Sequence, residues 1–288
     1  MSALLGAMQG AAAQGVLWGI MVLGVYITYK LLDIADLTVD GSFALGGCVC
    51  AILVANKIVD PVTALFLSAM AGVLAGAVTG ILHTLFEIPA ILAGILTQIA
   101  LWSVNLRVMG GKSNVPLLKE KTLISGFVDM TGMKQSQGAL IIGIIVAVAT
   151  IAILYWFFGT EIGCSIRATG SNQNMSRAQG INTDFTKILG LMISNGIVAF
   201  ASGLYAQYQG FADVNAGRGA IVIGLAAVII GEVVFGKISQ NFGFKLFSVA
   251  FGAIIYYLVL QVVLWMGLNS NDLKLLSALV VAVFLAIP

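Results

Sequence analysis

Polar and aromatic side chains recur at helical spacing inside one apolar stretch near the middle of the chain. Gln98, Trp102 and Asn105 follow at steps of four and three residues, with Thr97 beside them, so a helix would carry them along one stripe. Inside a helix bundle such a stripe is either a set of contacts between helices or the wall of a polar path. Both readings stay open. If it is a path, Trp102 is the candidate for stacking on an aromatic or apolar substrate.

Three carboxylates lie close together in the polar run LLDIADLTVDGS, which separates two apolar runs. They are Asp33, Asp36 and Asp40. A carboxylate within a membrane is costly and marks function, whereas one at a helix start is an ordinary cap. Asp40 precedes an apolar run that begins near Gly41, so we expect it either to cap that helix or to have a functional role.

No combination of residues predicts catalysis or a metal site. The only histidine is His83, and the three cysteines, Cys48, Cys50 and Cys164, have no zinc-site spacing. A run containing Gly231 and Lys237 has the spacing of a phosphate-binding loop, but Ile238 stands where that loop needs a hydroxyl. We therefore expect no catalytic residue, no metal and no ATP site or other cofactor in this chain.

Composition identifies the class of protein. Of 288 residues, 60% are hydrophobic and 9% charged, and the mean hydropathy is +1.05. Soluble domains carry about a quarter of their residues as charged ones, so this is an integral membrane protein. A net charge of +2 gives no reason to expect nucleic-acid binding.

Apolar runs predict an all-α polytopic fold with about nine membrane segments in a single domain, residues 1–288. The runs cover residues 3–29, 43–55, 61–86, 88–106, 138–158, 186–208, 219–235, 245–268 and 273–288. Those at 43–55 and 219–235 are short and contain glycine, so we expect broken or re-entrant elements there. Gly72, Gly76 and Gly80 form consecutive GxxxG steps, which predict close packing of helices.

One polar stretch, EIGCSIRATGSNQNMSRAQGINTDF, lies between two apolar runs that are each long enough to span a membrane. Ser171 or Asn172 could cap a short helix within it, and Gly180 could end that helix in a left-handed conformation. We expect one short surface helix. Its middle residues are small or slender, notably Met175 and Ala178, which suits it to a cleft on another protein.

Three motifs in order resemble a known family. The run RATGSNQNMSRAQGI resembles the cytoplasmic coupling loop of ABC importer permeases of the branched-chain amino acid type. The runs LTVDGSF and IPAILAGILTQIALWSVNLRVMGGKSN are similar to a subgroup of uncharacterised permeases associated with tryptophan and other amino acids. The resemblance covers roughly Gly24 to Lys245. Relatives often carry proline where this chain has Ala44, so the helix start there is less sharply enforced.

The resemblance assigns roles to segments and residues. It implies that residues 159–187 are a cytoplasmic coupling loop and that residues 107–137 form an extracytoplasmic loop. The residues that would couple to the ATPase are Arg167, Ser171, Asn172, Met175, Arg177, Ala178 and Gly180. It also places LTVDGSF beside the translocation path. The candidate path residues are Thr38, Asp40, Ser42, Gln98, Trp102 and Asn105.

The resemblance implies the membrane subunit of an ABC importer in the bacterial cytoplasmic membrane. The expected solute is a small molecule of the amino-acid class, with aromatic amino acids as candidates. The subunit's expected partners are a cytoplasmic ATPase that holds the ATP, an extracytoplasmic substrate-binding protein or lipoprotein, and a second permease copy. The alternative is a self-contained secondary transporter or channel, which would need an internal ion site or a repeated half. If the 159–187 loop is cytoplasmic, alternation of the segments leaves eight of the 14 basic residues on the outer side of the membrane. This distribution is opposite to the positive-inside rule.

Overall fold

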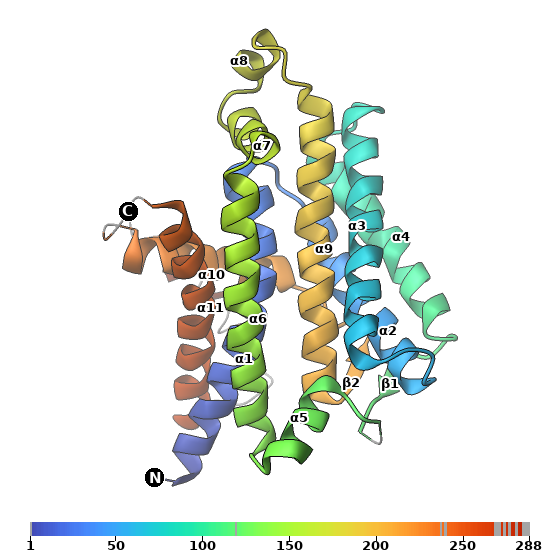
Figure 1. Cartoon of the computed structure of the whole chain (residues 1–288), viewed down its shortest axis with the longest axis vertical. Helices are drawn as coiled ribbons and strands as arrows, with labels where there is room; N and C mark the ends of the chain where they lie inside the picture. The colour runs from blue at the N-terminus through green and yellow to red at the C-terminus, as the bar shows by residue number, and fades with distance from the viewer. Residues whose placement is uncertain are drawn as a thin grey trace.

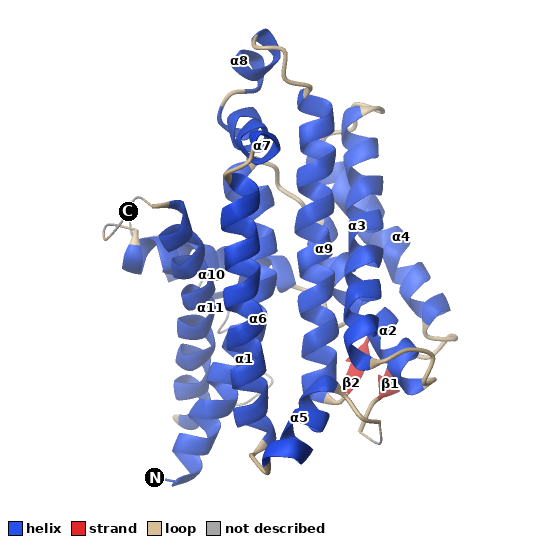
Figure 2. Cartoon of the chain, in the orientation of Figure 1, coloured by secondary structure: helices blue, strands red, loops and turns tan. Residues whose placement is uncertain are grey.

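The chain folds almost entirely into helices, as the colours of Figure 2 show. The computed structural model describes residues 2–118, 120–236, 238, 241–267, 272, 275, 278–279 and 282–283. Within these residues, seven helical segments are long and apolar enough to cross a membrane. They are α1 (Ser2–Tyr26) with its continuation η1 (Ile27–Leu31), α2 (Thr38–Ala55), α3 (Pro61–Thr84), α4 (Ala90–Val108), α6 (Gln135–Phe158), α9 (Thr183–Gln209) and α11 (Phe242–Trp265). The predicted all-α membrane fold is therefore confirmed.

The spans divide into a buried centre and an exposed periphery. The most buried spans are α1, α2 and α9, with 83%, 72% and 61% of the apolar window inside the structure. The least buried are α4 and α6, with 28% and 17%. Apolar side chains on α6 need no protein cover because lipid solvates them. The outer surface of α4 differs, since it also carries polar side chains.

Close glycine contacts join α3 to α9, which run side by side in Figure 1. A Cβ atom added at Gly72 would overlap the backbone of Asn195, and one at Gly76 would overlap that of Leu191. In lipid, helices gain little from burying apolar area, so small residues that let backbones approach stabilise the pair. The predicted GxxxG packing is confirmed.

The two short apolar runs behave differently. The run predicted at 43–55 is extended at its start, because α2 takes in Thr38, Val39 and Asp40 and becomes long enough to span. The run at 219–235 forms α10 (Ala220–Phe235), an apolar helix shorter than the spans. Figure 1 shows α10 lying across the bundle at about mid-height. The run predicted at 273–288 falls mostly outside the described residues.

The two ends of the bundle carry different small elements. At one end, β1 (Asn114–Pro116) pairs antiparallel with β2 (Phe211–Asp213), and α5 (Leu123–Thr131) lies beside them (Figure 1). At the other end are α7 (Glu161–Ser171) and α8 (Gln173–Ala178). The stretch predicted as one surface helix therefore forms two. Asn172 separates them because its extended backbone cannot continue α7.

An ion pair ties η1 to the last turns of α10. Lys30 Nζ lies 3.0 Å from Glu232 Oε2, with the two side chains 49% and 36% exposed. Glu232 thus takes part in a salt bridge near the end of its helix. An exposed pair of this kind contributes about 0–1 kcal/mol to stability, so its main effect is to fix where the two elements meet.

Candidate functional site

A cavity of about 620 Å³ lies between α2, α4 and the segment that leads into α10. Its polar and aromatic lining residues are Asp40, Gln98, Trp102, Ser103, Asn105 and Arg218. Gly41, Ala44, Ile99 and Val214 complete the wall. We call this cavity the α2–α4 pocket. Its volume falls within the range of about 300–1,000 Å³ that small-molecule sites occupy.

The stripe predicted on α4 divides between two environments. Gln98, Trp102 and Asn105 line the pocket, and Trp102 is 46% exposed. Thr97 turns the other way, where its hydroxyl accepts a hydrogen bond from Thr79 of α3 at 2.9 Å. Helical spacing therefore placed three of the four side chains at one cavity and the fourth at a contact between helices.

Asp40 caps a helix, but not the one predicted. It lies in the first turn of α2, whose N-cap residue is Leu37. Its carboxylate instead accepts hydrogen bonds from the backbone N–H groups of Gly219 and Ile221, at 3.0 and 2.9 Å. These donors belong to the start of α10, where N–H groups lack partners within the helix. Asp40 thus connects α2 to α10 at the wall of the pocket.

The Asn105 amide is buried at the pocket wall without a hydrogen-bond partner among the described residues. Its side chain is 1% exposed, yet neither Nδ2 nor Oδ1 has a hydrogen-bond partner among the residues that the structure describes. Buried amides in folded proteins are nearly always satisfied, and an unsatisfied one calls for a ligand, a water or a role in function.

Thr38 and Ser42 do not reach the pocket. Thr38 shares a hydrogen bond of 2.7 Å with the Thr79 hydroxyl. Ser42 donates to Asn195 Oδ1 at 2.6 Å, and Asn195 Nδ2 donates to Asp36 Oδ2 at 2.7 Å. Burial raises the pKa of the Asp36 carboxyl, while hydrogen bonds from Thr38 and Asn195 act in the opposite direction. These side chains join α2, α3 and α9 to the 32–37 linker.

The proposed coupling segment has well-defined ends. Asn172 Oδ1 accepts a hydrogen bond from the Met175 N–H at 2.9 Å and so caps α8, whereas Ser171 is the last residue of α7. Gly180 has a φ of +81°, the left-handed conformation that its type predicted. Its N–H and that of Ile181 bond back to the carbonyl groups of Arg177 and Ser176, which closes α8 as a Schellman motif.

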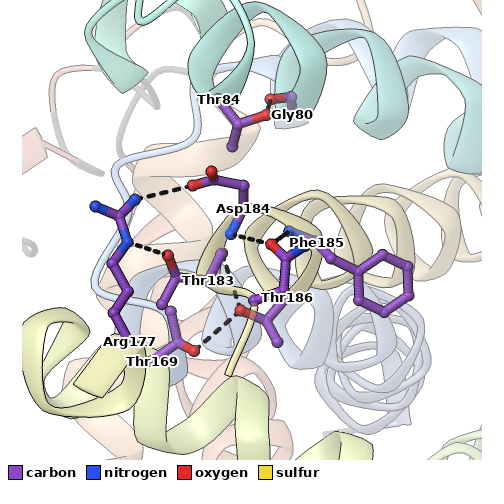
Figure 3. Close-up of polar contacts among 9 residues, drawn as sticks. Gly80, Thr84, Thr169, Arg177, Thr183, Asp184, Phe185 and Thr186 are labelled. Atoms are coloured by element: carbon purple, nitrogen blue, oxygen red, sulfur yellow. Dashed lines mark hydrogen bonds and ion pairs between the residues drawn. The ribbon is translucent and has the colours of Figure 1, made fainter. Parts of the chain in front are cut away.

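Arg177 fastens α8 to the bundle. Figure 3 shows its side chain reaching the first residues of α9, where Nε donates to Thr183 Oγ1 at 2.7 Å and Nη2 to Asp184 Oδ1 at 3.1 Å. In the same view, the hydroxyl groups of Thr169 on α7 and Thr186 on α9 lie 2.9 Å apart. Met175 and Ala178 remain exposed on the surface of α8.

A family model described as "Branched-chain amino acid transport system / permease component" matches residues 7–288. The chain belongs to this permease family. It is 40% identical to a tyrosine transport system permease protein of Clostridioides difficile, over 95% of this chain and 88% of that protein. It is 32% identical to an uncharacterized protein of Rickettsia prowazekii, over 92% of each chain. No solved structure matches the chain significantly.

A more distant similarity covers part of the permease. An autoinducer 2 import system permease protein of Salmonella typhimurium is 26% identical over 56% of this chain and 45% of that protein. The family and the seven apolar helices together identify the chain as a multi-pass transport permease of the bacterial inner membrane. The family is a transport component rather than an enzyme.

One pocket residue of the permease was missed from its sequence, and one predicted coupling residue has an additional contact. Arg167 lies on α7, where its guanidinium sits over the Phe242 ring, 4.9 Å from the centroid, and so ties α7 to α11. Arg218 lines the α2–α4 pocket and was not predicted. The available signal was a single arginine between Gly217 and Gly219 immediately before an apolar run.

Proposed function

We propose that this permease is the membrane subunit of an ATP-binding-cassette importer that carries an amino acid, and that the amino acid is aromatic. The single observation that carries the transport part is the family match over nearly the whole chain. The tyrosine permease of C. difficile supports the choice of solute. Trp102 supports it independently, because an exposed indole at a pocket wall offers a stacking surface to an aromatic ring.

The partner that supplies energy is a separate ATPase, which would hold the ATP in place of this chain. The phosphate-loop spacing fails at Ile238, and Lys237 lies outside the described residues. α8 is the proposed contact, since it is rigidly capped and carries Met175 and Ala178 exposed. In this arrangement the α8 end faces the cytoplasm.

α7, η1 and the 32–37 linker connect α8 to α2 in the bundle. α7 packs backbone to backbone on η1, since a Cβ atom at Gly170 would overlap the Leu31 carbonyl. η1 leads through the 32–37 linker to α2, whose Asp40 caps α10. A displacement of α7 would therefore shift α2 and the start of α10 at the α2–α4 pocket.

Two further partners complete the proposal. A second copy of the permease would cover the outer surface of α4, which exposes polar and aromatic side chains that lipid solvates poorly. An extracytoplasmic binding protein would deliver solute at the end that carries α5, β1 and β2. The 107–137 segment provides most of that surface.

Reconstitution tests this function. The permease and its ATPase, placed together in liposomes with the binding protein, should take up L-tyrosine only when ATP is supplied, and the purified permease alone should hydrolyse no ATP. Uptake driven by an ion gradient without the ATPase would instead identify a self-contained transporter. The ion gradient is applied to the same kind of liposomes, so ATP-driven uptake and gradient-driven uptake are compared directly.

Trp102→Ala tests the pocket. Removing a stacking surface should lower aromatic amino-acid uptake by about tenfold, because an aromatic pair contributes about 0.5–1.5 kcal/mol beyond the area it buries. Trp102 is 46% exposed, so amounts in the membrane should not change. Trp156→Ala is the matched control, because Trp156 is 71% exposed on α6 and does not line the α2–α4 pocket. Equal uptake by both variants would place the path elsewhere.

A further inference from the structure

The α2–α4 pocket contains one acidic and one basic side chain, Asp40 and Arg218. The wall therefore has no net charge and carries one charge of each sign. A solute with a large net charge would leave one of these two groups without a counter-charge. A zwitterion matches this arrangement, since it brings one charge of each sign.

Arg218 is positioned by a tight turn on α2. A Cβ atom at Gly217 would overlap the Asp40 carbonyl, and Gly219 has a φ of +87°. The backbone on both sides of Arg218 is thus fixed against the first turn of α2. Within the described part of the chain, the Arg218 guanidinium forms no ion pair. A planar group with five donors is therefore available for a carboxylate, which it can bind through two parallel hydrogen bonds.

Asn105 and Asp40 also line this pocket and offer acceptors. Both polar atoms of the buried Asn105 amide lack a partner among the described residues. The Asp40 carboxylate receives two backbone N–H groups, and a carboxylate has about four lone-pair sites, so it has capacity left. An ammonium group carries three donors and no acceptor, and these oxygens suit it.

We propose that Arg218 and Asn105 are the specificity-determining residues of this permease: Arg218 binds the carboxylate of the transported amino acid, and Asn105, with Asp40, binds its ammonium group. This assignment rests on the proposed function and adds to it a binding site within the membrane subunit itself. Trp102 then faces the solute's side chain. The pocket then selects mainly for the carboxylate and ammonium groups of the solute.

This assignment predicts which analogues are rejected. A solute that lacks the carboxylate leaves Arg218 unpaired, and sites built to pair a polar group discriminate strongly against analogues without it. Tyramine is L-tyrosine without its carboxylate and is the direct probe. The permease should bind L-tyrosine more tightly than tyramine even when no binding protein is present.

Equilibrium binding to the permease–ATPase complex in lipid nanodiscs, without binding protein, tests Arg218. The wild-type complex should prefer L-tyrosine over tyramine by about tenfold or more, and Arg218→Gln should remove that preference. Arg107→Gln is the matched control, because Arg107 is an exposed arginine of α4 that does not line the pocket. Wild-type preference in Arg218→Gln, or no preference in the wild-type complex, would overturn the assignment.

Asn105→Leu separates a binding role from a structural one. A structural asparagine stabilises the fold, whereas one whose amide is unsatisfied without ligand costs stability. Asn105→Leu should therefore keep or raise the melting temperature while weakening L-tyrosine binding by about tenfold. A lower melting temperature with unchanged binding would contradict the proposal. A wrong importer function gives a different result from a wrong binding assignment. If the importer function is wrong, the wild-type complex will show no ATP-dependent uptake of any amino acid.

Discussion

Ala178→Asp should abolish the association of the permease with its ATPase while leaving the membrane bundle intact. Ala178 is exposed in the last turn of α8, so the substitution disturbs no packing within the chain. Docking would desolvate the new carboxylate without a partner, which costs about 3–5 kcal/mol and lowers affinity by about a hundredfold or more. Co-purification of the two subunits and ATPase activity in the presence of solute measure the effect.

Met130→Asp is the control for that experiment. Met130 is 88% exposed on α5, at the opposite end of the bundle, so it receives the same carboxylate far from α8. Association should then equal that of the wild type. Normal transport by Ala178→Asp, at wild-type abundance in the membrane, would show that α8 is not the coupling element.

Gly180→Val probes the shape of the same segment instead of its charge. A Cβ atom at Gly180 meets no atom within 4 Å, so the only obstacle is its φ of +81°. A β-branched residue held there costs about 1–3 kcal/mol, and α8 would lose its fixed end. Gly180→Val should therefore weaken ATPase association less than Ala178→Asp does.

The ends of α8 were predictable because they depend on a few consecutive residues. An asparagine cap needs only the N–H of a residue three positions on, and the left-handed Gly180 follows from its own lack of a side chain. The first of the two helices, α7, was missed although its cap is also local. Thr160 caps α7 through the Gly163 N–H, and that cap follows closely on the apolar run predicted at 138–158.

The α2–α4 pocket was predictable only in part. Gln98, Trp102 and Asn105 share a helix, so spacing alone brings them together. Asp40 and Arg218 meet there across more than 170 residues of sequence, through the capping of α10 by α2, and no local pattern encodes that contact. Thr38 and Ser42 lie near Asp40 in sequence, but the helix turns them toward α3 and α9.

The start of α2 shows how the polar linker was misread. Thr38 and Asp40 looked like residues outside an apolar run, which placed the helix start near Gly41. In the structure, Asp36 Oδ1 accepts the Thr38 N–H at 2.9 Å, so Asp36 satisfies a donor at the start of α2. The helix therefore begins inside the polar run, and its polar side chains are satisfied by other helices.

Asn195→Leu should be the most destabilising single change within the bundle. Asn195 is fully buried on α9 and links two other elements, since its Nδ2 donates to Asp36 and its Oδ1 accepts from Ser42. Leucine is of similar size but satisfies neither group. Leaving a buried carboxylate without its partner costs about 3–5 kcal/mol. The melting temperature of the purified permease should fall markedly.

The double variant Asp36→Asn/Asn195→Leu distinguishes lost pairing from poor packing. Asparagine at position 36 keeps an oxygen for the Thr38 N–H but removes the charge that Asn195 solvates. If pairing is the cause, the double variant should be more stable than Asn195→Leu alone, with a coupling energy of about 0.5–3 kcal/mol. Strictly additive effects would assign the loss to packing between α9 and α3, where Gly72 lies against the Asn195 backbone. Coupling would instead show that the 32–37 linker is held by this carboxylate, and that the link from α7 to the α2–α4 pocket depends on it.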